Sequence, residues 1–388
     1  MKEKGKPIAG TLLRGFQQRE TRSSAVLLLL AGVLVASLSV WLWTSQPERY
    51  SVTEARRLAY TVEPSWDRVR SGELAEQVEK YARDQFPLRD GFRNLKGLTA
   101  MKALGQKDLN HIYTAGGYCA KMEYPLNRKM IDHAADTIQT VYDTYLKGTD
   151  THLYLGVVPA KDYYLAPQSG HLYLDYEEVF GYLKEQTPYL QPIEGIRECL
   201  SLEDYYKTDS HWRQEKILDV ADRIAESMGV TLPEQTYTLQ RFPRPFHGTY
   251  ANQLALPLPG EELYYLTSPM LDQCVVTTCD IAGNERQDEM YTEKDAYDWY
   301  PYNLFLSGAE GYVTVYNPLA ETDRELVLFR DSFGSSLGPL LASGYRKITL
   351  VDLRYLPSTR VGEFLTFQDQ DVLFLYSTLL LCNSLALR

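Results

Sequence analysis

The sequence predicts an α/β domain in which helices cover both faces of a parallel β-sheet. Four short apolar runs, at residues 152–158, 325–329, 347–351 and 371–376, have the length and composition of buried strands. Helical or mixed stretches separate these runs, and such alternation is typical of a parallel sheet. With 388 residues, of which 44% are hydrophobic and 23% charged, the chain is long and apolar enough to bury a sizeable core.

The N-terminal region is organised around an uncharged apolar segment. Residues 25–43 number nineteen and contain no charged side chain. At about 1.5 Å per residue, such a helix spans the ~30 Å hydrocarbon core of a bilayer. Trp41 and Trp43 lie at one end, where an aromatic belt forms, and basic residues lie at the other. The segment predicts one transmembrane helix, with residues 1–24 as a cytoplasmic tail and the body outside the cell.

A cleaved signal peptide and a buried core helix are the alternatives for this segment. The apolar run is longer than the ~7–15 residues usual in a signal peptide, and no clear A-x-A cleavage site follows it. A core helix of this length would normally carry more polar residues along one side. We therefore expect a retained single-pass anchor at the cell membrane.

Charge is unevenly distributed along the chain. Residues 1–24 hold six basic and two acidic side chains, a net charge of +4, which leaves −15 for the remainder out of a total of −11. An acidic body disfavours nucleic-acid binding, which requires basic surface. The five cysteines are widely spread and predict neither a disulfide framework nor a zinc site. Pairing of Cys274 with Cys279 across a turn is left open.

The remaining segments follow from hydrophobic periodicity and from glycine and proline positions. Residues 44–70 are polar and predict a stalk, and residues 71–388 predict the exported domain. A helical pattern begins near Gly72 and continues to Gly105, with a break at residues 84–90 around Pro87. Further predictions are a hairpin at residues 112–118 and helices at residues 127–147, 177–190 and 213–228. Residues 230–310 are rich in tyrosine and proline and predict an insertion of loops and small strands.

Two segments together hold the residue types of a serine nucleophile site. Ser332 follows an apolar strand at a turn, and Asp209 and His211 lie two residues apart outside a helix. Acyl transfer at a hydroxyl needs a serine, a histidine that accepts its proton, and a carboxylate that orients the histidine. Taken singly, Ser332 is also a typical helix N-cap and His211 a typical structural histidine. A metal site at Asp209 and His211 is a further alternative, but no additional ligands stand at a readable spacing.

Several sequence blocks resemble the bacterial DHHW proteins, which are SGNH-hydrolase-like and of the alginate O-acetylation type. The blocks are YYKTDSHW at residues 205–212, SGELAEQVEKYARDQFPLRDGF at 71–92, VVPAKDYY at 157–164, FRDSFGSSLGPLL at 329–341, ITLVDLRYL at 348–356 and DVLFLYSTLLL at 371–381. The resemblance covers about residues 70–388 and is weakest at 256–300. Ser210 stands where the DHHW motif has histidine, at a position outside the expected triad.

The resemblance implies an SGNH-like fold and a membrane-anchored O-acetyltransferase or acetylesterase that acts on an extracellular polysaccharide. It also implies a multi-pass membrane O-acyltransferase as partner. From the residues themselves we expect no metal or cofactor. By motif position, Ser332 would be the nucleophile, His211 the base and Asp209 the orienting acid.

Further residues are expected near the substrate. Gly308 is the candidate oxyanion donor, with a simple turn as the alternative. Arg330, Arg354 and Lys161 are expected as cations facing an anionic or polar substrate, with surface ion pairing as the alternative. Tyrosines of the insertion could stack on sugars or simply pack. A non-catalytic envelope protein that binds or assembles polysaccharide with the same fold is the alternative function.

Overall fold

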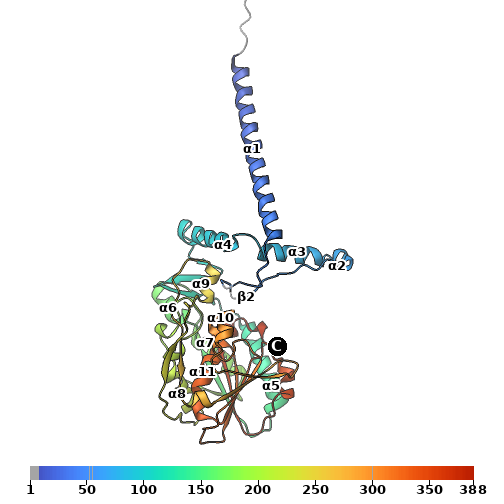
Figure 1. Ribbon diagram of the computed structural model, residues 1–388. Helices are drawn as coiled ribbons and strands as arrows, with labels where there is room; N and C mark the ends of the chain where they lie inside the picture. Colours follow the sequence, from blue (N-terminus) through green and yellow to red (C-terminus); the bar gives the residue numbers. More distant parts are fainter. Residues whose placement is uncertain (1–7, 52, 55, 299) are drawn as a thin grey trace, which may run out of the picture. The chain divides into compact units, whose positions relative to one another are not determined.

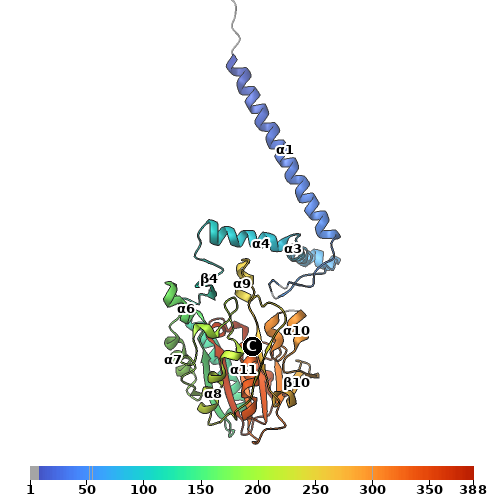
Figure 2. The same cartoon turned by 60° about the vertical axis from the view of Figure 1, so that its left-hand side comes forward.

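The computed structural model describes residues 8–51, 53–54, 56–298 and 300–388. Contacts between residues divide this chain into two compact units. The first comprises residues 8–51 and 56–93, and the second comprises residues 53–54 and 94–388. Figures 1 and 2 show the elements of each unit along the colour gradient of the sequence.

The first unit is helical. Its elements are α1 (Ile8–Thr44), α2 (Trp66–Ser71), α3 (Glu73–Asp84), the first half of α4 (Arg89–Leu98), and the short pair β1 (Tyr50–Ser51) and β2 (Arg56–Arg57). Within α1, Ser24–Thr44 is 21 residues long and apolar enough to cross a membrane, a criterion that a signal sequence also meets. The Ser37 and Ser39 hydroxyls donate to carbonyls one turn earlier at 2.8 Å, which satisfies them inside an apolar helix.

The break predicted within residues 84–90 is confirmed. Helix α3 ends at Asp84 and α4 begins at Arg89. The buried Asp84 carboxylate accepts hydrogen bonds from the Arg56 guanidinium at 2.6 Å and from the backbone N–H of Ala59 at 2.8 Å. These bonds fix the end of α3 to the segment that precedes α2.

The second unit is built on an eight-stranded mixed sheet. From edge to edge its strands are β11 (Glu285–Asp288), β10 (Val275–Cys279), β12 (Tyr312–Tyr316), β14 (Lys347–Val351), β13 (Glu325–Arg330), β15 (Asp371–Ser377), β6 (His152–Val158) and β7 (Gln191–Pro192). The five strands from β14 to β7 are parallel. The four apolar runs of the sequence are β6, β13, β14 and β15, so both the predicted strands and their parallel arrangement are confirmed.

Helices cover both faces of the parallel strands (Figures 1 and 2). One face packs against α8 (Leu218–Ser227) and α11 (Ser332–Leu341), and the other against α5 (Arg128–Val141) and α7 (Tyr176–Gln186). Strand β13 shows why the sheet is buried on both sides. Its Leu326 and Leu328 belong to the first core, and its Val327 and Phe329 belong to the second.

The sheet is more extensive than the sequence predicts. Strands β10, β11 and β12 extend it with antiparallel pairing, and β10 and β11 come from the expected insertion at residues 230–310. Polar residues such as Thr277 and Thr314 alternate with buried valines there, because only one face of these strands is covered by the core. The insertion therefore completes one edge of the sheet.

The other elements of the second unit are short. They are β3 (Asp108–Leu109), β4 (Ile112–Ala115), β5 (Tyr118–Lys121), α6 (Asp162–Ser169), β8 (Thr238–Arg241), α9 (Thr249–Leu254), β9 (Tyr264–Thr267), α10 (Glu293–Asp298) and α12 (Thr378–Leu381). Strands β4 and β5 form the hairpin predicted at residues 112–118. Cys274 and Cys279 are free cysteines separated by the extended length of β10, so these two do not pair.

Candidate active site

Ser332 lies at the carboxyl end of β13, where the backbone turns into α11. The preceding residue, Asp331, caps the helix, and its Oδ1 accepts a hydrogen bond from the N–H of Phe333 at 3.0 Å. Its Oδ2 accepts from the N–H and the hydroxyl of Ser377 at 2.9 and 2.6 Å, which links the end of β13 to the end of β15. Ser332 is therefore the first residue of α11, held in place by a buried carboxylate on a neighbouring position.

Asp209 and His211 lie in a turn closed by an antiparallel bridge between Tyr205 and Trp212. The turn brings both side chains to Ser332. His211 Nδ1 lies 2.5 Å from Asp209 Oδ1, and His211 Nε2 lies 2.6 Å from Ser332 Oγ. Asp209 is fully buried and His211 nearly so, whereas Ser332 is half-buried and is the member of the three that solvent reaches.

The Asp209 carboxylate is surrounded by hydrogen-bond donors. Its Oδ2 accepts from the N–H of Thr249 at 2.7 Å, from the Thr249 hydroxyl at 3.0 Å and from the Tyr300 hydroxyl. Its Oδ1 accepts from the backbone N–H and the ring of His211. Burial alone would raise the pKa of Asp209, but the attraction of His211 and these hydrogen bonds lower it well below its usual range. The carboxylate is thus stable as an anion.

The His211 ring is fixed from one side by an aromatic ring. Tyr302 stacks on it, with 3.9 Å between ring centroids and 12° between ring planes. The Tyr302 hydroxyl in turn lies 2.8 Å from Ser336 Oγ, which also accepts a hydrogen bond from Trp212 Nε1 at 2.8 Å. One hydroxyl on α11 therefore fixes both the residue that stacks on His211 and the residue that follows it.

Several of these residues were not predicted from the sequence. Thr249, Tyr300 and Tyr302 lie in residues 230–310, which the sequence predicts to be an insertion outside the α/β core. No local pattern marks them, because their partners Asp209 and His211 lie at least 40 positions away.

The four further residues expected near the substrate occupy other positions. The N–H of Gly308 donates to the carbonyl of Phe305 at 3.1 Å, so it is already engaged and is not an open oxyanion donor. Arg330 is fully buried, and its guanidinium lies 3.2 Å from Asp352. This ion pair is internal, so the expectation of Arg330 as a substrate-facing or surface cation was wrong.

Arg354 and Lys161 are also engaged with protein groups. Arg354 makes a two-point contact with the same Asp352 carboxylate, at 2.9 and 2.6 Å, and keeps about a quarter of its side chain exposed. Lys161 is 1% exposed and donates to backbone carbonyls of the turn that carries Asp209. Lys161 is therefore neither a substrate-facing cation nor part of a surface ion pair, because its side chain is buried.

The start of α11 supplies a donor near Ser332. The N–H of Ser332, at the first position of a ten-residue helix, has no acceptor inside that helix. A helix start favours negative charge through its N–H groups and its dipole. The Ser332 hydroxyl therefore lies beside both the His211 ring and the N–H groups at the start of α11.

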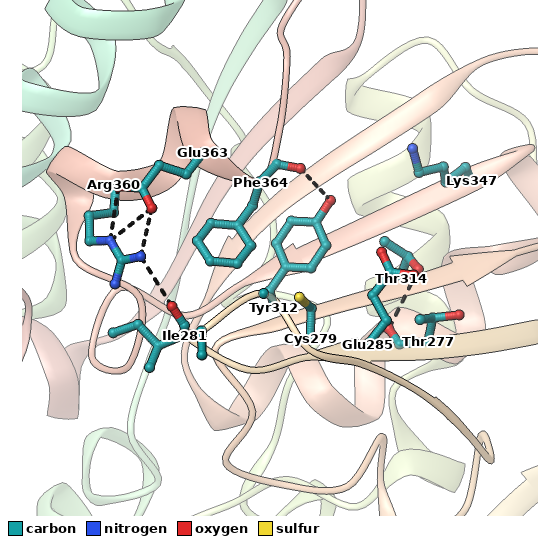
Figure 3. A pocket seen from close by; sticks show the side chains of 12 residues that line it. Thr277, Cys279, Ile281, Glu285, Tyr312, Thr314, Lys347, Arg360, Glu363 and Phe364 are labelled. Atoms are coloured by element: carbon teal, nitrogen blue, oxygen red, sulfur yellow. Dashed lines mark hydrogen bonds and ion pairs between the residues drawn. The ribbon is translucent and has the colours of Figure 1, made fainter.

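A separate pocket of about 550 Å³ is lined by residues of β10–β12 and of the 3₁₀ helix Ser358–Glu363 (Figure 3). The rings of Tyr312 and Phe364 line this pocket, and so do Arg360 and Glu363, which pair at 2.6 Å. Asp209, His211 and Ser332 do not line this pocket. The pocket is thus distinct from the serine site.

Comparison with protein-family models found no match, and comparison with curated proteins found none either. Solved structures do match. A DHHW family protein from Eubacterium siraeum aligns with a TM-score of 0.56 at 17% identity, covering 72% of this chain and 94% of that chain. PatB1 from Bacillus cereus aligns with a TM-score of 0.57 at 22% identity, covering 70% and 96%.

PatB1 has also been solved with a sulfonyl adduct, at a TM-score of 0.56 and 21% identity over 70% of this chain and 95% of that chain. The O-acetyltransferase domain of AlgJ from Pseudomonas putida aligns less well, with a TM-score of 0.43 at 13% identity over 70% and 92%. The expected resemblance to the DHHW proteins is therefore confirmed at the level of the fold: this chain has the SGNH-like α/β fold that a DHHW family protein and PatB1 share.

Proposed function

We propose that this chain is a membrane-anchored, exported serine acyltransferase or esterase that acts on a cell-surface polysaccharide. The observation that carries the proposal is the hydrogen-bond chain from Asp209 through His211 to Ser332, with 2.5 and 2.6 Å between the joined atoms. Acyl transfer uses this combination of a buried carboxylate, an imidazole and a reachable hydroxyl.

In the first half-reaction, Ser332 Oγ attacks the carbonyl carbon of the acyl donor while His211 Nε2 takes the hydroxyl proton. Asp209 accepts from Nδ1 and favours the imidazolium that forms. The N–H of Ser332 is placed to donate to the oxyanion. Collapse of the tetrahedral species breaks the bond to the leaving group, His211 returns the proton to it, and Ser332 is left as an acyl ester.

In the second half-reaction, an acceptor hydroxyl loses its proton to His211 Nε2 and attacks the ester carbonyl. The bond to Ser332 Oγ breaks, and His211 returns the proton to that oxygen. A sugar hydroxyl as acceptor gives O-acetylation, and water gives hydrolysis. Exclusion of water from the acyl-enzyme decides between the two.

A catalytic test compares the wild type with Ser332→Ala, each as the full chain in detergent. The substrate is an aryl acetate, and the covalent probe is a sulfonyl fluoride, chosen because PatB1 has been solved with a sulfonyl adduct. We expect Ser332→Ala to lower acetate release at least ~10³-fold and to abolish labelling.

Ser343→Ala is the matched control for this test. Its hydroxyl is buried without a hydrogen-bond partner in the described structure, so removal changes little at the site. Equal activity and equal labelling of the wild type and Ser332→Ala would overturn the catalytic proposal and favour a non-catalytic binding or assembly role. Mass spectrometry of an added oligosaccharide then separates transfer from hydrolysis.

The membrane placement rests on the apolar helix and on the charge around it. The helix at Ser24–Thr44 is preceded by the +4 tail, and an excess of Lys and Arg keeps such a tail in the cytoplasm. The body would then meet its polysaccharide outside the cell, beside a multi-pass O-acyltransferase that supplies acyl groups. Protease added outside intact cells should digest the body; full protection of the body would refute this orientation.

A further inference from the structure

Lys161 places a buried ammonium group under the turn that carries Asp209. The residue lies between the end of β6 and the start of α6, and its side chain is 1% exposed. Its Nζ donates to the carbonyl of Tyr206 at 2.7 Å, to that of Lys207 at 3.0 Å and to that of Asp209. Three N–H donors meet three acceptors, so only the charged form of the amine satisfies all of them.

Glu261 holds the opposite side of the same turn. Its Oε2 accepts from the N–H of Lys207 at 2.6 Å, and its Oε1 accepts from the N–H and the hydroxyl of Thr208 at 2.7 and 2.5 Å. Three carbonyls of this turn, those of residues 206, 207 and 209, thus bind a cation, and two of its N–H groups, those of residues 207 and 208, bind an anion. Each charge lies at the end of the peptide dipoles that stabilises it.

The groups around Lys161 determine the pKa of its amine. The titratable groups that face it are Cys119, Asp162, Asp209 and Glu261, and the ring of Tyr250 lies 5.2 Å from Nζ. The Tyr118 ring lies 6.0 Å away. Burial lowers the pKa of Lys161 to about 8, against the weaker opposing effect of these acidic groups. The amine therefore loses its proton within an experimentally accessible pH range.

We infer that Lys161 is a positioning residue for the proposed reaction, and that its ammonium charge, opposed by Glu261, fixes the turn that aims Asp209 and His211 at Ser332. This inference rests on the proposed function. Loss of the proton leaves two donors for three carbonyls, so one carbonyl is released and the turn loosens. A displacement near 1 Å at such a site costs on the order of 10²-fold in rate.

The test measures kcat and KM for aryl acetate between pH 6 and 10, with the full chain in detergent. For the wild type we expect kcat to fall above about pH 8. Lys161→Gln, which is neutral at every pH, should lower kcat on the order of 10²-fold, leave KM within about 3-fold and remove the alkaline fall. Lys161→Arg keeps the charge and should recover part of kcat with the fall moved to higher pH.

Two further variants make the result specific. Glu261→Gln weakens the other side of the turn, and it should lower kcat about 10-fold while the alkaline fall persists and moves to lower pH, because the Glu261 charge raises the pKa of Lys161. Lys129→Gln is the matched control, because Lys129 is exposed on α5, and it should behave as the wild type.

The inference and the proposed function fail separately. A wild type that neither releases acetate nor is labelled by the sulfonyl fluoride refutes the function. An active wild type without an alkaline fall, or a folded Lys161→Gln with kcat within about 3-fold of wild type, refutes the role of Lys161 alone. If Lys161→Gln does not fold, the wild-type pH dependence of labelling at Ser332 still decides the question, since it requires no variant.

Discussion

Gly248→Ala tests whether the backbone around Asp209 must stay where it is. Gly248 directly precedes α9 and is buried against the Asp209 turn, with its N–H donating to the Thr208 hydroxyl at 3.1 Å. Its φ of −74° and ψ of 164° are accessible to alanine, so the substitution introduces no backbone strain of its own. Any effect comes from the added methyl group.

The size of the perturbation follows from the contacts of that methyl group. A Cβ at position 248 would lie 2.3 Å from the carbonyl carbon of Thr208 and 2.4 Å from the N of Asp209, whereas ordinary contact begins at 3.4 Å. One of the two segments must move by about 1 Å. Displacement of this order at Asp209, the proposed orienting acid, should cost roughly 10²-fold in kcat, and overpacking costs about 1–3 kcal/mol of stability.

The assay is aryl acetate hydrolysis together with thermal unfolding of the full chain. Gly181→Ala adds the same atom on α7, where nothing lies within 4 Å of the new Cβ, and should leave kcat unchanged. We expect Gly248→Ala to remain folded with kcat lowered about 10²-fold. A folded Gly248→Ala with kcat within 3-fold of wild type would refute the reasoning, because the turn would then tolerate displacement.

Two predictions concern stability. Asp162 is buried, and its Oδ2 has no hydrogen-bond partner among the described residues. Burial raises the pKa of Asp162 to about 7, above the ~3.9 of an unfolded chain. The stability that the protonated carboxyl group contributes is therefore present below about pH 4 and is lost as the pH rises through 7. Asp162→Asn should therefore stabilise the protein by up to about 3 kcal/mol more at pH 8 than at pH 5 in urea unfolding, and equal effects would contradict this. Arg330→Met leaves the buried Asp352 with one partner fewer and should cost about 3 kcal/mol. Arg128→Met, which removes an exposed pair with Glu178, should cost under about 1 kcal/mol, and similar losses would refute the distinction.

The sequence predicts the parallel core well, because its strands are continuous apolar runs buried on both faces. Strand β6 and strand β14 have the predicted bounds, and β13 and β15 are each one residue longer. Strands β10 and β12 are not detected in this way, since buried residues such as Val276 and Val313 alternate with less buried ones such as Thr277 and Thr314. A half-covered strand has no continuous apolar run to detect.

The sequence predicts some residues of the site and misses others for a similar reason. Asp209, His211 and Ser332 stand in recognisable local contexts, and the fold brings the three together. The groups around them are defined by partners far along the chain, as with Glu261, 53 positions from Thr208. Arg330 is the clearest error, because an arginine at a strand end suggests exposure and only the fold reveals the buried Asp352 beside it.

The separation of the reacting groups along the chain has a consequence for when chemistry can begin. His211 and Ser332 are 121 positions apart, and Tyr300 and Tyr302, which hold Asp209 and His211, lie between them. Such non-local contacts form late, since loop closure must precede them. If the chain is exported as proposed, Asp209, His211 and Ser332 come together only after Ser332 has left the translocation pore, and a partly exported chain would not react with acyl donors.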